Sequence, residues 1–132
     1  MYMLDTNMIS FLIRDRGGEL FRKFEKVYQK DKIVISSIVY AEVLYGVKKK
    51  NSPKLQNRVK SLLSLFDILP FDKKAGEVYA DIRRDLSSRG IIIGANDMLI
   101  ASHAKSLDAV LVTNNTKEFL RVDDLKIEDW SK

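Results

Sequence analysis

The chain has 132 residues, of which 45% are hydrophobic, and its 23 basic and 18 acidic side chains give a formal net charge of +5. The lack of cysteine excludes disulfides and thiolate metal sites, and the single histidine excludes a multi-histidine zinc centre, so oxygen must supply most ligands of any metal. No apolar run approaches the roughly 18 residues of a membrane span, and no secretory signal is recognisable. We therefore expect one cytoplasmic domain over residues 1–132, whose positive charge favours a polyanionic partner.

The first residues form a short apolar run that stops at Asp5-Thr6-Asn7. This pattern predicts a buried strand that leads into a helix, with Asp5 at the carboxyl end of the strand. Ligands bind at that edge of open α/β sheets, because strand ends and helix N-termini meet there. A purely structural role is also open, since Asp5 or Thr6 would be an ordinary cap for the next helix.

Helical and strand patterns then alternate along the chain. Helices are predicted over residues 8–14, 19–30, 38–50, 53–66, 72–90, 95–105 and 116–119, and strands over 33–35, 67–71 and 109–112, with an edge segment near Trp130. Alternation of this kind predicts a single-domain α/β/α sandwich with a mostly parallel central sheet.

The helix over residues 38–50 carries apolar residues around nearly all of its circumference, yet Glu42 lies among them. A carboxylate stripped of water costs several kcal/mol unless it is paired or metal-bound, so Glu42 needs a partner. An Arg or Lys from another element and a metal ion are both open as that partner.

Two further acids stand near the ends of predicted elements. Asp97 falls in the first turn of its helix, where an acid suits the helix dipole for structural reasons alone, and Glu118 follows an expected Thr116 cap. Because parallel strands end at one edge of a sheet, Asp5 and Glu118 should face one cleft, and Glu42 and Asp97 should border it.

Crowded carboxylates raise one another's pKa and destabilise a fold unless a cation neutralises them. The four acids therefore indicate a divalent metal, and oxygen ligands alone favour Mg²⁺, with Mn²⁺ as a substitute. A metal in an acidic pocket of a basic protein fits phosphodiester hydrolysis, in which the ion polarises phosphoryl oxygens while Lys and Arg side chains carry the polyanion. The number of ions is open at this point.

Four segments, in this order, resemble the PIN-domain ribonucleases: Leu4-Asp5-Thr6-Asn7, Ser36-Ser37 with Glu42, Asn96-Asp97-Met98-Leu99-Ile100-Ala101, and Val112-Thr113-Asn114-Asn115-Thr116-Lys117-Glu118-Phe119. Within that family they look like the VapC toxins of bacterial type II toxin–antitoxin modules, over essentially the whole chain. The resemblance implies a Mg²⁺-dependent endoribonuclease of the cytoplasm, with structured RNA such as tRNA as substrate. It also implies a homodimer formed through the helices, and a cognate VapB-type antitoxin that covers the active-site groove and alone contacts DNA in a larger toxin–antitoxin complex.

By position, the resemblance implies that Asp5, Glu42 and Asp97 are the core catalytic, metal-binding acids. Glu118 would be the fourth. The supporting polar residues would be Thr6, Asn7, Asn96, Thr113 and Asn115. Many PIN domains place an Asp soon after the residue that matches Thr113, whereas this chain has Asn114-Asn115 there, a departure that concerns a second metal position.

Three other functions are consistent with parts of the sequence. A magnesium-dependent phosphatase also starts from an Asp after strand one, but the second acid of its D-x-D pattern is Asn7 here, which cannot exchange a proton. A phosphoacceptor receiver domain would need paired acids near the end of that strand. A non-catalytic nucleic-acid-binding module would use the basic clusters Lys48-Lys49-Lys50, Arg83-Arg84 and Arg22-Lys23, which solvated helix faces explain equally well.

Overall fold

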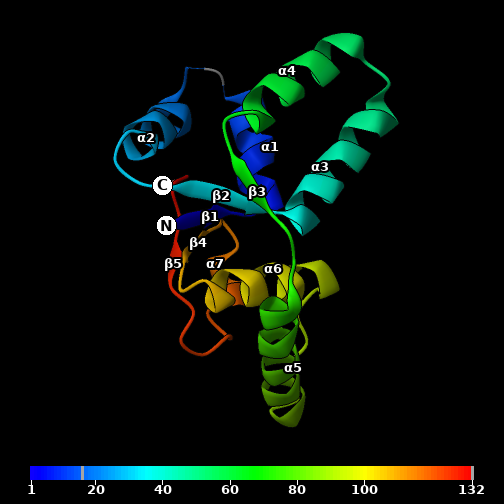
Figure 1. The fold of residues 1–132 in the computed structure, drawn as a ribbon, viewed down its shortest axis with the longest axis vertical. Coiled ribbons are helices and arrows are strands. Elements are labelled where there is room, and N and C mark those ends of the chain that lie inside the picture. The colour runs from blue at the N-terminus through cyan, green and yellow to red at the C-terminus, as the bar shows by residue number, and fades with distance from the viewer. Residues whose placement is uncertain (16, 132) are drawn as a thin grey trace.

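The computed structural model describes residues 1–15 and 17–131, and a parallel β-sheet lies at its centre (Figure 1). Among these residues the sheet has five strands in the order β3-β2-β1-β4-β5, and every neighbouring pair is parallel. The strands are β1 (Tyr2–Leu4), β2 (Ile33–Ser36), β3 (Asp67–Leu69), β4 (Val110–Val112) and β5 (Ile127–Glu128). The predicted α/β architecture with a parallel sheet is confirmed.

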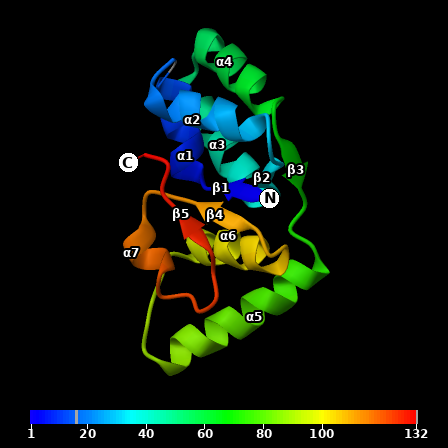
Figure 2. The same ribbon diagram turned by 90° about the vertical axis from the view of Figure 1, so that its left-hand side faces the viewer.

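Helices cover both faces of this sheet. They are α1 (Thr6–Arg14), α2 (Glu19–Tyr28), α3 (Ser37–Lys50), α4 (Pro53–Leu63), α5 (Lys73–Ser88), α6 (Ala95–Ser106) and α7 (Thr116–Phe119). The first four lie on one face, and α5, α6 and α7 lie on the other (Figures 1 and 2). Within the described residues, none of the helices is both long and apolar enough to cross a membrane.

Short polar side chains begin the helices that follow the central strands. The Asp5 carboxylate accepts a hydrogen bond from Met8 N–H at 2.9 Å, and the Ser36 hydroxyl accepts one from Ile38 N–H at 3.1 Å. These bonds satisfy backbone donors that have no partner inside the helix. The sequence predicted that this helix begins at Met8. It begins two residues earlier, at Thr6, because Asp5 is its N-cap.

The expected Thr116 cap of α7 is wrong. Asn115 occupies the cap position, and Thr116 is the first helical residue. The backbone explains the difference, because Asn115 N–H donates to Thr113 Oγ1 at 2.9 Å and so closes a tight turn directly after β4. The Asn115 side chain makes no cap and instead contacts Glu118.

Helix α3 is buried along one stripe rather than around its circumference. Val39, Val43 and Val47 face the core, whereas Tyr45 is 64% exposed. The sequence analysis placed Glu42 among apolar residues that surround the helix, and this placement is wrong. Glu42 is half-buried, and it borders the core at the edge of the stripe.

The core is built on the central strands, which helices cover on both faces. Met3 and Leu4 of β1 and Leu111 and Val112 of β4 are fully buried. Leu4 pairs with Val112, and Val112 pairs in turn with Glu128 of β5. The residues that follow these three strands therefore leave the sheet side by side, at its carboxyl edge.

Replacement of Leu111 by Ala should lower the free energy of unfolding by about 2–5 kcal/mol, because it removes buried methyl groups and leaves a cavity in a covered strand. Urea unfolding followed by circular dichroism measures this loss. The matched control is Leu120→Ala, since Leu120 is 72% exposed and its loss should change stability by no more than about 0.5 kcal/mol. Equal losses in the two variants would contradict this description of the core.

Candidate active site

Asp5, at the carboxyl end of β1, is both a helix cap and a buried acid. Its side chain is 4% exposed and accepts hydrogen bonds from Met8 N–H and from the Thr113 hydroxyl. Burial raises the pKa of Asp5, the bonds from Thr113 and Met8 lower it, and the charges of Glu42 and Asp129 raise it further. The structural and the functional interpretations of Asp5 are therefore compatible.

Glu42 projects from α3 and is held by one donor on each carboxylate oxygen. The Thr6 hydroxyl donates to Oε1 at 2.6 Å, and the Asn96 amide donates to Oε2 at 2.8 Å. Both donors are neutral. The ion pair with Arg or Lys that the sequence left open is not formed by Glu42 within the described residues.

Glu118, in α7, is held in the same manner beside Asp97 of α6. Gly94 N–H donates to Glu118 Oε1 at 2.8 Å, and the Asn115 amide donates to Oε2 at 2.6 Å. A Cβ atom at Gly94 would lie 3.4 Å from Asp97 Oδ2, so the backbone before α6 passes close to this acid. Burial, a hydrogen bond with Glu118 and the charges of the other acids raise the pKa of Asp97 to about 7.

The structure brings the four predicted acids into one site. Glu42 accepts hydrogen bonds from the chain neighbours of Asp5 and Asp97, and Asp97 is hydrogen-bonded to Glu118. The charges of Glu118, Asp5 and Glu42 accordingly all raise the pKa of Asp97. Four of the predicted supporting residues bond directly to one of these acids, namely Thr6, Asn96, Thr113 and Asn115. The fifth, Asn7, donates instead to Asn114 Oδ1 at 3.4 Å, across the exposed rim of the site.

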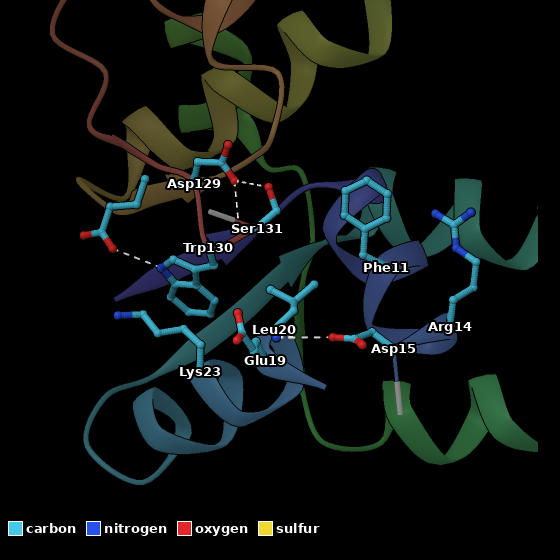
Figure 3. Close-up of a pocket in the computed structure, with 10 residues that line it drawn as sticks. Phe11, Arg14, Asp15, Glu19, Leu20, Lys23, Asp129, Trp130 and Ser131 are labelled. Carbon is cyan, nitrogen blue, oxygen red and sulfur yellow. Dashed lines mark hydrogen bonds between the residues drawn. The ribbon is translucent and has the colours of Figure 1, made fainter. Parts of the chain in front are cut away.

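Asp129 is an acid of this edge that the sequence interpretation missed. It directly follows β5, its charge contributes to the raised pKa of Asp5, and its Oδ2 atom is buried without a hydrogen-bond partner. Its Oδ1 atom accepts a hydrogen bond from Ser131 N–H at 2.9 Å (Figure 3). The signal that located Asp5, an acid just after a strand, applies here too. An edge segment near Trp130 was predicted, but its end was not, because the strand has only 2 residues, and so Asp129 was not placed at that end.

A cavity of about 860 Å³ lies beside this acid, between α1, α2 and the C-terminal residues (Figure 3). Phe11, Lys23 and Trp130 line it, and the Trp130 indole N–H donates to Glu128 at 3.0 Å. None of the four predicted acids is among its lining residues. The cavity is therefore a neighbour of the acidic site and not the site itself.

A second hollow, of about 410 Å³, lies between α1, α3 and α4. Glu42 is the one acid of the four that lines it, beside Arg14, Lys50 and Arg58 and a set of apolar side chains (Ile13, Val43, Val47, Leu55 and Val59). We call this hollow the basic groove, because three cationic side chains line it near Glu42. Cations beside an acidic site are the arrangement expected for a polyanion whose reacting phosphate lies at the acids.

The four acids fit a hard divalent cation in their chemistry, because every ligand they offer is a carboxylate oxygen. None of them forms an ion pair with Lys or Arg in residues 1–15 and 17–131, so only neutral donors offset their repulsion. In the described residues, no group of three or more His, Cys, Asp or Glu side chains is close enough together to bind one metal ion. Mg²⁺ suits such an arrangement, because it commonly takes one or two carboxylates and keeps several waters.

Without a metal, the protein should become less stable as the pH rises from about 4 to about 7. The raised pKa of Asp97 means that the folded protein keeps a proton that the unfolded chain releases in this range, so the free energy of unfolding falls until Asp97 is ionised in both states. Asp97→Asn removes the titration, and we expect a flatter curve and a higher melting temperature at pH 8. Thermal unfolding in EDTA at several pH values tests this, and superimposable wild-type and variant curves would contradict it.

Comparison with known proteins agrees with the four motifs and the fold. The model of the PIN domain family matches residues 2–125. Ribonuclease VapC2 of Rickettsia felis is 42% identical to the chain over 133 residues, covering 100% of this chain and 99% of that protein. The tRNA(fMet)-specific endonuclease VapC of Shigella flexneri is 37% identical, with 98% of each chain covered. The crystal structure of VapBC2 from Rickettsia felis bound to a DNA fragment from their promoter matches with a TM-score of 0.93, at 42% identity and 98% coverage of each chain. The chain therefore belongs to the PIN-domain family and, within it, to the VapC ribonucleases.

Proposed function

We propose that this chain is the endoribonuclease toxin of a toxin–antitoxin module and that it hydrolyses RNA phosphodiester bonds in the bacterial cytoplasm. One observation carries the proposal: four carboxylates from separate elements share one edge of the sheet without an ion pair to Lys or Arg among the described residues. Such a site gains stability when a cation occupies it, because the cation offsets the repulsion among the acids. PIN-domain nucleases in general depend on a divalent metal.

Asp5, Glu42, Asp97 and Glu118 would surround that cation, some of them directly and the others through the waters that Mg²⁺ keeps. We infer the ion to be Mg²⁺, with Mn²⁺ as a substitute. When bound, the ion neutralises the acids and polarises the scissile phosphate. Asp97 must give up the proton that its raised pKa lets it keep near neutral pH. The bonds from Met8 N–H and Thr113 keep Asp5 fixed at the end of the rigid strand while this occurs.

The basic groove supports RNA as the substrate. Arg14, Lys50 and Arg58 line the same hollow as Glu42, so a phosphate backbone bound by them would lie close to one of the four acids. A relative 37% identical over almost the whole chain is named a tRNA(fMet)-specific endonuclease, which supports tRNA as the substrate class.

A VapB-type antitoxin is the inferred protein partner. The matching Rickettsia felis structure contains a VapBC2 complex on a promoter fragment, and the chain matches it over 98% of its length. We infer that the toxin forms a homodimer within such a complex and that contact with DNA is made by the antitoxin.

Asp5→Asn and Asp97→Asn should each reduce RNA cleavage by at least about a hundredfold, because each removes a charge that the reacting centre needs. Labelled total RNA incubated with pure protein and Mg²⁺, with and without EDTA, measures the activity. Asp124→Asn is the matched control, since Asp124 is exposed and its φ of 59° is one that Asn accepts. Full cleavage by either site variant, or binding of RNA without cleavage by the wild type, would contradict the proposal.

Expression of the chain without its antitoxin should arrest bacterial growth, because uncontrolled cleavage of RNA stops protein synthesis. The Asp5→Asn variant, at equal protein level, should allow growth. Growth curves after induction, with protein levels compared by immunoblot, provide the measurement. Normal growth in cells that contain wild-type protein able to cut RNA in vitro would argue against a toxin.

A further inference from the structure

The two donors that hold Glu42 are chain neighbours of the two aspartates. Thr6 directly follows Asp5, and Asn96 directly precedes Asp97. Each donates to a different oxygen of the Glu42 carboxylate, at 2.6 Å and 2.8 Å. We call this pair of hydrogen bonds the Glu42 clamp. It fixes the carboxylate of α3 relative to the backbones from which both aspartates project.

The neutrality of the clamp matters for the chemistry. A Lys or Arg in either position would hold Glu42 equally well, but it would also cancel the charge that a metal ion needs. A hydroxyl and an amide restrict the carboxylate to one orientation and leave its negative charge in place. Each oxygen accepts only one bond from the clamp and keeps a lone pair for another partner.

We propose that Thr6 and Asn96 are positioning residues, which set the metal affinity of the site by holding Glu42 through this clamp. The inference rests on the proposed metal centre and goes beyond it, because neither residue is itself a ligand. Partners that orient metal-binding side chains typically contribute 10–100-fold to metal affinity or activity.

A merely structural role predicts a different result. The bond from Asn96 is exposed to solvent, and the helices that it joins also pack against each other along α3 and α6. Its loss should therefore cost little stability, as for other exposed hydrogen bonds. Loss of metal affinity without loss of metal-free stability is the signature of positioning.

The test is calorimetric titration of the full-length chain with Mn²⁺ at pH 8, alongside thermal unfolding in EDTA. Asn96→Ala and Thr6→Val should each raise the Kd for Mn²⁺ about 10–100-fold while melting within a few degrees of the wild type. Thr6→Ser keeps the hydroxyl and should bind Mn²⁺ like the wild type. Asn57→Ala is the matched control for Asn96→Ala, because Asn57 is exposed on the surface of helix α4.

Cleavage assays add a second readout. If the clamp acts through the metal, saturating Mn²⁺ should restore most of the kcat of Asn96→Ala, and the metal concentration for half-maximal rate should shift with the Kd. Wild-type affinity in both Asn96→Ala and Thr6→Val, or equal weakening in Thr6→Ser and Thr6→Val, would overturn the proposal. Failure of the wild type to bind Mn²⁺ would instead overturn the metal centre itself, so the two failures are distinguishable.

Discussion

Repulsion among carboxylates at one edge of a parallel sheet is the constraint on which the rest of this structure depends. Its clearest consequence is the pKa of Asp97, which burial and the neighbouring acids raise to about 7. The metal-free fold tolerates this repulsion because neutral donors hold Glu42 and Glu118, and backbone N–H groups hold Asp5 and Glu118. A cation bound at this edge would stabilise the folded protein, because it would relieve repulsion that exists only in the folded state.

The sheet makes such crowding possible by burying everything below its edge. Leu4, Leu111 and Val112 are fully covered, so the strands cannot shift or fray to separate the acids that follow them. Asp5 then serves two purposes with one side chain, since the bond that starts α1 also fixes its carboxylate. A site built on strand ends and helix starts needs few additional residues for its rigidity.

The sequence predicted the layers and the parallel sheet, because alternating apolar runs are local patterns. It also predicted that four acids lie at one edge of that sheet; their role as metal ligands stays a prediction. It did not predict the partners of Glu42, since Thr6 and Asn96 are separated from it by 36 and 54 positions. It predicted an edge segment near Trp130 but not that Asp129 directly follows the strand, which has only 2 residues. Tyr45 shows a further limit of prediction from sequence. It is a large apolar residue of α3, yet it is exposed, and the residue type alone does not tell whether a helix position faces the core or the surface.

Asn115, which follows β4, affects the electrostatics of the site through its contact with Glu118. Its amide donates to Glu118 Oε2 at 2.6 Å, in a position where an aspartate would place two carboxylates in contact. That contact would add to the repulsion that already raises the pKa of Asp97. Compared with an aspartate at this position, the Asn115 amide leaves the site with one negative charge fewer, and it also orients Glu118. At this position Glu118 therefore has a neutral hydrogen-bond donor as its neighbour and not a third crowded carboxylate.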